Sequence, residues 1–495
     1  MLILGIDIGT SSVKVSVMDA QSCECIASAY HPETEAESLS IKNGWAEQDP
    51  ENWWSDLKKA ILKCHSSDKY DPQNIAAIGI AYQMHGLVMI DKDQKVLRPS
   101  IIWCDSRAVD IGNNAFHELG KEYCLDNLLN SPGNFTASKL AWVKKEEPEV
   151  YKKLFKVMLP GDFISMKLTG EISSTVEALS EGTFWDFKKN KISKELMDHF
   201  DFDQDSLPEI KDVFSIHGLL KSNIAAELSL KDNIPVSYKA GDQPNNALSL
   251  DVLEPGEIAA TAGTSGVIYG ISDKLTFDQQ SRINSFAHVN HSTDDCRIGV
   301  LLCINGVGIL NKWIKNITNN SGTYSDMNNA ISKVQSGSEG LRVLPFGNGA
   351  ERMLNNKIVG SHICNIDLNI HSSAHLYRAC QEGIAFAFRY GLDIMRENGM
   401  TPSVIRAGCA NLFLSDPFLE AFVNVTNTPV QLYNSDGSIG AAIGAGLGAG
   451  IFKDRRLAFS GMRILKTVEP TRDHNYEIFY QDWKNILNNK MLAIN

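Results

Sequence analysis

The chain has 495 residues, of which 43% are hydrophobic and 21% charged, a composition typical of a folded globular protein rather than a disordered or collagen-like one. At about 150 residues per domain, two or three domains are expected. The formal net charge of −12 excludes the basic footprint of a protein that binds nucleic acid or an anionic membrane. The N-terminus lacks the features of a secretory signal, the longest apolar stretch is short, and the ten cysteines show no zinc spacing, so we expect a cytoplasmic protein without a membrane partner.

The first ninety residues predict strands joined by tight turns and one amphipathic helix. Apolar runs separated by turn residues are typical of an antiparallel meander. The helix is expected to open at Asp49-Pro50 and to place Trp53, Leu57 and Ile61 on one face. The expected elements are strands at residues 2–8, 13–19, 25–30, 75–81 and 87–90 and a helix at about 50–65.

A five-residue pattern occurs twice in the chain. Gly9-Thr10-Ser11-Ser12-Val13 is echoed by Gly263-Thr264-Ser265-Gly266-Val267, 254 residues later, and each copy stands between two apolar runs. An echo of five residues alone could arise by chance, but the shared strand–turn–strand context halfway along the chain favours an internal duplication. We therefore expect two related α/β domains that face each other across a cleft.

The second half continues with helices and strands, followed by a C-terminal tail. The strands are expected to end at Gly408-Cys409-Ala410-Asn411 and at Asp436-Gly437. The tail, residues 453–495, is expected to be helical and to pack on the surface. The other expected elements are helices near 304–317, 371–398 and 438–450, an Asn-, Ser- and Gly-rich loop at 316–326, and strands at 403–407 and 429–433.

The two Gly-Thr-Ser turns suit the binding of a polyphosphate. Glycine allows close approach of the backbone, and the small hydroxyls donate to phosphate oxygens without adding bulk. Each turn alone could equally be an ordinary hairpin turn, but their repetition favours phosphate binding. The chain contains neither G-x-x-x-x-G-K-[ST] nor G-x-G-x-x-G, which excludes the P-loop and the dinucleotide-binding fingerprint.

Two aspartates are candidates for the chemistry of phosphoryl transfer. Asp7 lies at the end of the first strand beside Gly9, where it could hold Mg²⁺ through water, or simply form an Asx turn. Asp242, in Gly241-Asp242-Gln243-Pro244, could accept the proton of an attacking hydroxyl. It could equally be the N-cap of a helix that has Pro244 in its first turn, and the spacing does not decide between these two roles.

Other candidates stand at strand ends. His85 follows an apolar strand and precedes Gly86, so it could contact a polar ligand or be a hydrogen-bonded structural residue. The small residues from Gly408 to Asn411 could leave a flat slot for a purine or form a tight turn. Four tryptophans could stack on a sugar, although such aromatics usually belong to the core: Trp45, Trp53, Trp54 and Trp103.

These motifs together resemble the FGGY family of carbohydrate kinases, within the actin-like ATPase superfamily, over about residues 2 to 452. Most of the motifs are weak singly, but their order along the chain is highly specific. Gln83-Met84-His85-Gly86 in particular is similar to the sugar loop of the family members that act on xylulose. The further matching segments are Gly5-Ile6-Asp7-Ile8-Gly9-Thr10, Gly44-Trp45-Ala46-Glu47-Gln48-Asp49-Pro50, Trp53-Trp54, Trp103-Cys104-Asp105-Ser106-Arg107, Lys139-Leu140-Ala141-Trp142, Leu159-Pro160, Gly241-Asp242-Gln243 and Asp436-Gly437-Ser438-Ile439-Gly440-Ala441-Ala442.

The resemblance implies an α/β fold with two duplicated actin-like (ribonuclease H-like) domains and a cleft between them. It implies an N-terminal sugar-binding domain at 1–248, a C-terminal nucleotide-binding domain at 255–452 and the tail at 453–495. The implied activity is ATP-dependent phosphorylation of the terminal hydroxyl of D-xylulose, which gives D-xylulose 5-phosphate. The implied cofactors are ATP and Mg²⁺, and the implied partners are the sugar and ATP. The resemblance leaves open whether the chain forms a homodimer.

The resemblance also assigns roles to individual residues. Asp242 matches the general base, which favours the base over the helix cap, and Asp7 matches the carboxylate that positions Mg²⁺. The positions that match substrate contacts are Met84, His85 and Gln243. The positions that match nucleotide contacts are Thr10, Ser11 and Ser12 in the first phosphate turn, Gly263 and Thr264 in the second, Gly308 beside the ribose, and Gly408 to Asn411 at the adenine.

Two departures from the family pattern bear on specificity. The run Asp242-Gln243-Pro244 stands where many relatives that act on xylulose have Asp-Asn-Ala, which leaves the sugar open. The adenine segment reads Ala407-Gly408-Cys409-Ala410-Asn411 in place of Gly-Gly-Gly-Ala-x-Ser, which changes the groups that line the purine. One alternative is therefore a kinase of the same family for ribulose, fuculose or glycerol. Another is a non-catalytic actin-like ATP switch, although such a switch needs neither the 83–86 loop nor Asp242.

Overall fold

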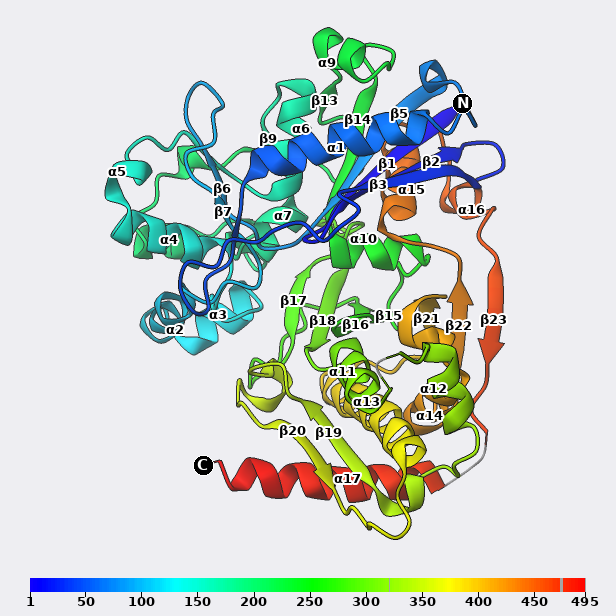
Figure 1. The fold of residues 1–495 in the computed structure, drawn as a ribbon. Coiled ribbons are helices and arrows are strands. Elements are labelled where there is room, and N and C mark those ends of the chain that lie inside the picture. Colours follow the sequence, from blue (N-terminus) through cyan, green and yellow to red (C-terminus); the bar gives the residue numbers. More distant parts are fainter. Residues whose placement is uncertain (320, 472–474, 495) are drawn as a thin grey trace.

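The computed structural model describes residues 1–319, 321–471 and 475–494, which form two α/β halves (Figure 1). The first half is built on a six-stranded sheet with the order β13-β14-β5-β1-β2-β3. In this sheet β1 pairs antiparallel with β2 and parallel with β5, and β5 pairs parallel with β14. Its strands are β1 (Leu2–Ile8), β2 (Val13–Asp19), β3 (Cys25–His31), β5 (Ile75–Tyr82), β13 (Gly218–Leu219) and β14 (Pro235–Gly241).

The second half is built on a seven-stranded sheet with the order β17-β18-β16-β15-β21-β22-β23. Here β15 pairs antiparallel with β16 and parallel with β21, and β21 pairs parallel with β22. Its strands are β15 (Ile258–Ala262), β16 (Gly266–Ser272), β17 (Asn284–Ala287), β18 (Ile298–Ile304), β21 (Ile405–Gly408), β22 (Val430–Tyr433) and β23 (Ile464–Val468).

The two sheets contain the same core topology. The order β3-β2-β1-β5-β14 in the first half corresponds to β18-β16-β15-β21-β22 in the second, with the same parallel and antiparallel pairings. The repeated Gly-Thr-Ser motif occupies the turn between β1 and β2 in one half and between β15 and β16 in the other. The duplication and the two-domain α/β fold predicted from the sequence are therefore confirmed.

Helices cover the sheets of both halves. In the first half they are α1 (Pro50–His65), α2 (Val109–Glu118), α3 (Lys121–Asn127), α4 (Thr136–Glu146), α5 (Pro148–Tyr151), α6 (Pro160–Thr169), α7 (Val176–Glu181), α8 (Lys194–His199), α9 (Ser222–Glu227) and α10 (Asp242–Ser249). In the second half they are α11 (Gly308–Asn319), α12 (Tyr324–Ile331), α13 (Ser373–Glu397), α14 (Asp416–Thr426) and α17 (Asn475–Leu492). Two late helices, α15 (Gly437–Gly448) and α16 (Arg455–Ala458), lie on the first half. The helix expected at 304–317 begins four residues later, because residue 304 still belongs to β18.

The late helix α15 packs on the sheet of the first half, beside β1, β5 and β14 (Figure 1). Two glycines allow this close approach. A Cβ at Gly5 would lie 1.8 Å from the Ser438 carbonyl oxygen, and one at Gly79 would lie 2.0 Å from the Ala441 carbonyl oxygen. The opposite face of the same sheet packs against α1 and α6. The chain therefore returns from the second half to complete the core of the first.

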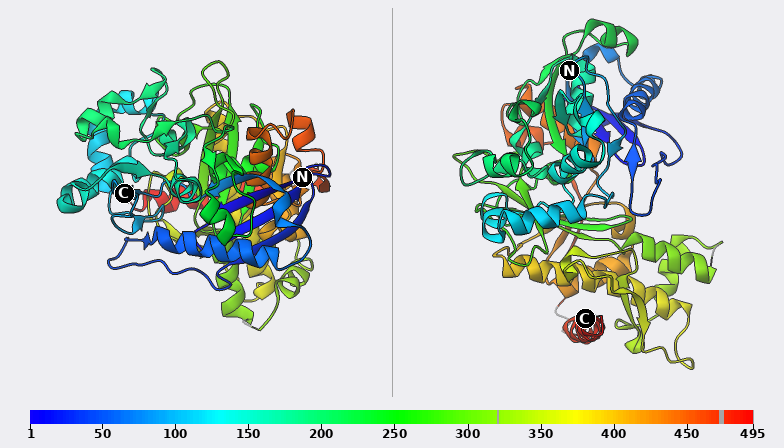
Figure 2. Two further views of the ribbon diagram at one scale, coloured as in Figure 1. Left: turned by 90° about the horizontal axis from the view of Figure 1, so that it is seen from above. Right: turned by 90° about the vertical axis from the view of Figure 1, so that its left-hand side faces the viewer.

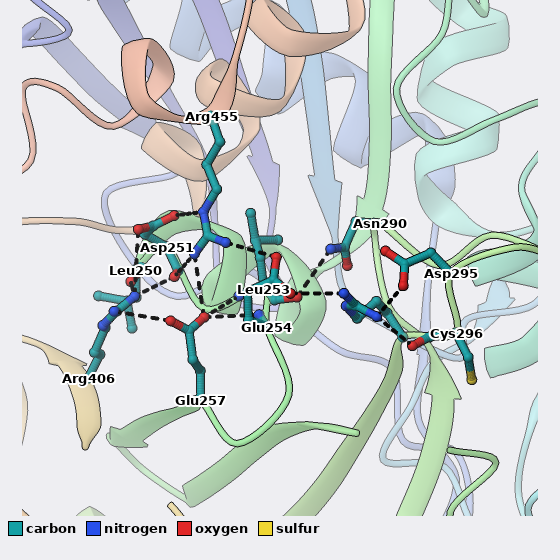
Figure 3. A network of polar contacts seen from close by, with 11 residues as sticks. Leu250, Asp251, Leu253, Glu254, Glu257, Asn290, Asp295, Cys296, Arg406 and Arg455 are labelled. Atoms are coloured by element: carbon teal, nitrogen blue, oxygen red, sulfur yellow. Dashed lines mark hydrogen bonds and ion pairs between the residues drawn. The ribbon is translucent and has the colours of Figure 1, made fainter. Parts of the chain in front are cut away.

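A network of ion pairs surrounds the connection between the two halves (Figure 3). Arg455 donates to Asp251 at 2.6 Å and to Glu254 at 3.0 Å, and Arg406 pairs with Glu257 at 3.2 Å. Arg455 belongs to α16, Arg406 lies in β21, and the three acidic residues lie in the segment that links α10 to β15. The network thus joins the linker to elements of both halves.

The C-terminal tail differs from the expected helical segment. Residues 464–468 form β23, which pairs with β22 at the edge of the second sheet. The helix α17 lies at the end of the second half that is remote from the first sheet (Figure 1 and the right-hand view of Figure 2). It buries Tyr480 and Trp483 completely, and the indole N–H of Trp483 donates to the Val343 carbonyl at 2.8 Å. The tail is therefore part of the core rather than a surface addition. Within the described ranges, no helix has the length and apolar character needed to cross a bilayer.

Candidate functional site

The first predicted phosphate turn is a tight hairpin turn whose hydroxyls already have partners. The Gly9 N–H donates to the Ser12 carbonyl at 3.0 Å, which closes the turn between β1 and β2. The Thr10 hydroxyl donates to Gln83 Oε1 at 3.2 Å and accepts from the Trp103 indole N–H at 3.0 Å. The turn is therefore tied to the 83–86 loop and to Trp103, so a phosphate bound by the Thr10 hydroxyl would replace one of these bonds.

Asp7 lies in an acidic environment at the N-terminus of α15. Burial, reinforced by the charges of Asp242 and Asp436, raises the pKa of Asp7 to about 7. A Cβ at Gly437 would lie 2.2 Å from Asp7 Oδ2, so only glycine fits there. Because the Gly9 N–H is used by Ser12, the structure does not show the Asx-turn alternative. The Asp7 side chain is half-buried. Among the described residues, no hydrogen bond fixes the position of its carboxyl.

Asp436 and Lys14 complete this acidic cluster, and the sequence analysis assigned neither a role. Asp436 caps α15 by accepting from the backbone N–H groups of Ser438, at 3.0 Å, and Ile439, at 3.2 Å. The Lys14 ammonium forms an ion pair with it across the two halves and contributes to the lowered pKa of Asp436, against the opposing effect of burial. The motif Asp436-Gly437-Ser438 was visible in the sequence, but its proximity to Asp7 depends on the packing of α15.

The second predicted phosphate turn packs against the start of α11. The Gly308 N–H donates to the Gly263 carbonyl at 2.8 Å, and the Ile309 N–H donates to the Thr264 carbonyl at 3.2 Å. A Cβ at Gly308 would lie 2.3 Å from the Gly263 carbonyl oxygen, which explains why a glycine stands there. Gly263 and Gly308 thus bring the β15–β16 turn to the N-terminus of α11, where the helix dipole favours an anion, although the Gly308 and Ile309 N–H groups already donate to carbonyls of the turn.

A pocket of about 540 Å³ opens beside this turn. It brings together four of the predicted nucleotide contacts, Gly263, Thr264, Gly308 and Asn411, with apolar side chains and one lysine. Asn411 adopts φ +54°, a left-handed conformation that asparagine tolerates, at the start of a 3₁₀ turn. The lining side chains that the sequence analysis missed are Glu35, Ile309, Asn311, Lys312, Tyr324, Asn328, Gln381, Leu412, Leu414 and Ser415.

The two predicted phosphate turns approach each other through Glu35. Ser11 donates to Glu35 Oε1 at 3.0 Å, and Glu35 itself lines the pocket next to Gly263. Gly408 lies at the end of β21, where a Cβ would be 3.3 Å from the Ser435 carbonyl oxygen, and it is not among the lining residues of this pocket. The structure thus gathers four of the predicted nucleotide residues in one pocket, links Ser11 to it through Glu35, and leaves Gly408 outside.

Asp242 is the first residue of α10, and Gly241 occupies the N-cap position. Asp242 is therefore not the N-cap of this helix, which was the alternative to its role as a base. Burial raises the pKa of Asp242 to about 6, opposed by hydrogen bonds from Gln243. Its side chain stays half-buried, and so does that of Gln243. A carboxyl of this kind is ionised at neutral pH and accessible to a ligand.

The 83–86 loop contacts Gly241, the residue directly before Asp242, through Met84. A Cβ at Gly241 would lie 2.7 Å from Met84 Cγ, so the loop and the start of α10 are in close contact. His85 adopts φ +61°, and its Nδ1 lies 3.1 Å from the Glu181 carbonyl oxygen. Because a carbonyl only accepts, Nδ1 carries the proton in the neutral ring, and Nε2 is left as an acceptor. Burial lowers the pKa of His85 to about 3, with a contribution from the Lys139 charge.

Lys139 fixes the backbone of the 83–86 loop by hydrogen bonds. Its ammonium donates to the carbonyl oxygens of His85, at 2.8 Å, and Ile102, at 3.0 Å, and the side chain is fully buried. The His85 ring packs edge-on against Phe135, with the ring centroids 4.8 Å apart. His85 and Met84 therefore form a rigid polar and apolar pair next to a carboxyl that can accept a proton.

The arrangement has the parts that a phosphoryl transfer to an alcohol needs. Asp242 can take a proton, the 83–86 loop offers an acceptor next to apolar and aromatic surface, and the pocket beside Gly263 lies at a helix N-terminus. A separate cavity of about 650 Å³, between Trp54, Arg98 and Lys221, contains none of the predicted site residues.

Comparison with known proteins places the chain in a class that transfers phosphoryl groups to sugars. The model of the FGGY family of carbohydrate kinases, N-terminal domain, matches residues 2–249, and the model of the C-terminal domain of the same family matches residues 258–449. The chain belongs to the FGGY family of carbohydrate kinases, as the sequence motifs implied.

Individual relatives cover nearly the whole chain. A xylulose kinase of Escherichia coli K12 is 28% identical over 449 residues, which span 89% of this chain and 88% of the relative. Among solved structures, a ligand-bound xylulose kinase from Lactobacillus acidophilus superposes with a TM-score of 0.90 at 22% identity and covers 100% of this chain and 99% of its own. A xylulose kinase from Brucella ovis superposes with a TM-score of 0.89 at 24% identity and covers 100% of both chains. At these identities, the structural matches show the fold.

Proposed function

We propose that this carbohydrate kinase transfers the γ-phosphoryl group of ATP to the terminal hydroxyl of D-xylulose. The observation that carries the proposal is the contact between Met84, in the 83–86 loop, and Gly241, the residue directly before Asp242. Similarity to curated xylulose kinases, such as the E. coli enzyme that matches 89% of this chain, supports the choice of sugar.

In the proposed reaction, Asp242 accepts the proton of the sugar hydroxyl. The hydroxyl oxygen forms a bond to the γ-phosphorus as the bond from this phosphorus to the bridging oxygen of ADP breaks. With a pKa near 6, the Asp242 carboxyl is mostly ionised at pH 7 and is therefore ready to act as a base. General-base assistance of this kind typically accelerates a reaction by about 10²–10⁴.

His85 would orient the sugar rather than transfer protons. A pKa near 3 keeps its ring neutral over the working range of pH. Its Nδ1–H is used by the Glu181 carbonyl, so Nε2 can accept a hydrogen bond from a sugar hydroxyl. Met84 supplies apolar surface beside it, and Gln243, directly after Asp242, is the candidate for a second hydrogen bond to the sugar.

ATP would occupy the pocket beside the second phosphate turn. Gly263 and Gly308 present the helix N-terminus to the phosphates, and Lys312 adds a positive charge to the same pocket. The apolar residues Leu412 and Leu414, next to Asn411, offer a surface for the purine. The pocket volume of about 540 Å³ is of the size that small-molecule sites have.

The carboxyls around Asp7 fit a magnesium ion. Mg²⁺ prefers oxygen ligands and is usually held by one or two carboxylates together with water and phosphate oxygens. Among the described residues no cluster of three His, Cys, Asp or Glu side chains forms a ready metal cage, and a nucleotide-bound Mg²⁺ does not need one. Asp7, raised in pKa and close to Asp242 and Asp436, is the residue that would hold it. When bound, the ion would neutralise phosphate charge.

The experiment that tests the proposed function is ADP release from ATP and Mg²⁺, with and without D-xylulose, beside D-ribulose, L-fuculose and glycerol. Strong stimulation by D-xylulose is expected. Stimulation by another member of the panel would keep the kinase and reassign its sugar. Equal ADP release with and without every sugar would contradict the kinase and favour the ATP switch.

A further inference from the structure

A short helix behind the candidate site carries two buried glutamates that the proposed reaction does not use. Glu177 and Glu181 lie one turn apart on α7, and their exposed fractions are 1% and 0%. Residues four apart on a helix project from the same face. Burying a carboxyl costs free energy unless it is hydrogen-bonded, so a well-packed apolar pair would stabilise the fold better.

Each glutamate accepts a hydrogen bond from a different part of the candidate site. Glu177 Oε1 accepts from the backbone N–H of Gly241, at 3.1 Å, and Gly241 immediately precedes Asp242. Glu181 Oε1 accepts from the backbone N–H of His85, at 3.2 Å, and its carbonyl accepts from His85 Nδ1 at 3.1 Å. One helix therefore holds both the 83–86 loop and the turn that carries Asp242.

Gly241 is tightly packed between the two glutamates and Met84. A Cβ at Gly241 would lie 2.7 Å from Glu181 Oε2 and 3.2 Å from Glu177 Oε1, besides its contact with Met84. The second oxygen of Glu177 accepts a long hydrogen bond, 3.4 Å, from the hydroxyl of Tyr82, which directly precedes the 83–86 loop. The two carboxyls thus enclose Gly241 and set the distance between the loop and Asp242.

The electrostatics of the pair indicate neutral hydrogen-bonding groups rather than charges. Burial raises the pKa of Glu177 to about 8, and burial together with the neighbouring Glu177 raises the pKa of Glu181 well above its usual range. Burial therefore favours the protonated, uncharged form of both carboxyls. A glutamine, which keeps one accepting oxygen at the same position, is the matching uncharged substitute for each.

The helix also contacts the second half of the molecule. The backbone N–H of Ala287, in β17, donates to the Ser180 hydroxyl at 2.9 Å. Ser180 lies directly before Glu181, so α7 joins an element of the second half to both parts of the candidate site.

We propose that Glu177 and Glu181 are positioning residues with separate tasks, Glu177 for the Asp242 turn and Glu181 for the 83–86 loop. The inference rests on the proposed function, in which Asp242 accepts the proton and His85 contacts the sugar. Removal of the Glu177 oxygen therefore affects the chemical step, whereas removal of the Glu181 oxygen affects the binding of the sugar.

The test is steady-state kinetics of Glu177→Leu and Glu181→Leu with the stimulating sugar. Glu177→Leu is expected to lower kcat at least about tenfold and to leave the KM for the sugar within about threefold. Glu181→Leu is expected to raise the KM for the sugar at least about tenfold, with a smaller change in kcat. The KM for ATP should stay near the wild-type value in both variants, which also shows that they are folded.

The conservative variants distinguish positioning from a general loss of stability. Glu177→Gln and Glu181→Gln should each restore most of the parameter that the Leu variant lost, because the accepting oxygen returns. Glu382→Gln is the matched control, since Glu382 is also a buried helical glutamate, 2% exposed, but it pairs with Arg378 on the same helix and, in the described part of the chain, bonds to neither the 83–86 loop nor the Asp242 turn. It should change thermal stability without separating kcat from KM.

Two results would overturn the inference: the same loss of kcat and of sugar affinity in both Leu variants, or Gln variants as impaired as the Leu variants. If the Leu variants do not fold, Glu177→Asp and Glu181→Asp replace them with the same expectation, because the shorter side chain withdraws the oxygen from its N–H donor. A wild-type enzyme that no sugar stimulates would refute the proposed function instead. An active wild type with variants that do not separate kcat from KM would refute only the roles of Glu177 and Glu181.

Discussion

Burial decides the chemistry of the individual residues in the candidate site. Asp242 and Asp7 carry the same side chain as many surface aspartates, yet burial raises their pKa values to about 6 and about 7. The same effect works in the opposite direction on His85, whose pKa falls to about 3, because burial always disfavours the charged form. The site therefore combines a base that is ionised near pH 7 with a histidine that stays neutral.

The pH dependence of activity follows from the pKa of Asp242. Protonated Asp242 cannot accept the hydroxyl proton, so kcat/KM for the sugar should fall about tenfold per pH unit below pH 6 and level off above it. The measurement is kcat/KM from about pH 5 to pH 8 at saturating ATP and Mg²⁺. A profile that is flat across this range would contradict the assignment of Asp242 as the base.

The control for this profile is Asp242→Asn, which keeps the shape of the side chain and removes its basicity. It should lose most turnover and still bind the sugar, as followed by the quenching of tryptophan fluorescence. Activity within a few-fold of the wild type would exclude Asp242 as the base.

At the scale of elements, the position of α15 determines whether the acidic cluster exists at all. The helix brings Asp436 and Gly437 from late in the chain to Asp7 near its start, and Lys14 in β2 pairs with Asp436. Gly5 and Gly79 permit this by leaving the surface of the first sheet flat beneath the helix.

Gly79→Ala should therefore destabilise the protein and disturb the site together. The new Cβ would lie 2.0 Å from the Ala441 carbonyl oxygen, so α15 must move, and we expect a loss of about 3 kcal/mol in the free energy of unfolding. Chemical denaturation and kcat of the same preparation measure both effects.

A suitable control is Gly340→Ala, in the second half. There φ is +88° and no atom lies within 4 Å of the new Cβ, so only the left-handed conformation is penalised, by about 1 kcal/mol. If both variants lost the same stability, close packing of α15 would not be the reason for Gly79.

At the scale of the whole molecule, the network around Arg455 fixes the passage from the first half to the second (Figure 3). Arg455 reaches Asp251, Glu254 and Glu257, and its side chain is 34% exposed. Single surface ion pairs contribute about 0–1 kcal/mol, but several charges that share partners contribute more. The linker that any movement of the halves must bend is therefore held by this charge network together with the apolar packing of Leu250, Val252 and Leu253, which are buried.

Arg455→Met should lower the unfolding temperature and reduce its sensitivity to salt. In the wild type, added salt screens the network and lowers stability, whereas the variant has already lost these pairs. Thermal unfolding at low and high salt measures the difference.

The control here is Arg463→Met. Among the described residues Arg463 pairs with Glu24 alone, and both side chains are exposed, 79% and 55%, so its loss should have almost no effect. An equal effect of the two variants would show that the network adds nothing beyond a surface pair.

Many secondary-structure elements, the duplication and the enzyme class of this protein could be predicted from the sequence, because local patterns encode local structure. Apolar periodicity predicted the strands at residues 2–8 and 13–19 and the helix at 50–65 with the bounds that the structure has, and the repeated Gly-Thr-Ser turn predicted the duplication. The family motifs identified the class of enzyme. These signals lie within a few residues of each other or recur in a fixed order.

Which residues far apart in the chain come into contact is determined by the tertiary packing. The strand β23 was hidden because its residues are mostly exposed at a sheet edge, so no burial pattern marks them. The contacts of Glu177, Glu181 and Asp436 could not be predicted from spacing in the sequence. Their partners lie on other elements, at Gly241, His85 and Lys14. Burial likewise sets the pKa values of Asp7, Asp242 and His85, and burial is a property of the packed molecule, which no local pattern in the chain contains.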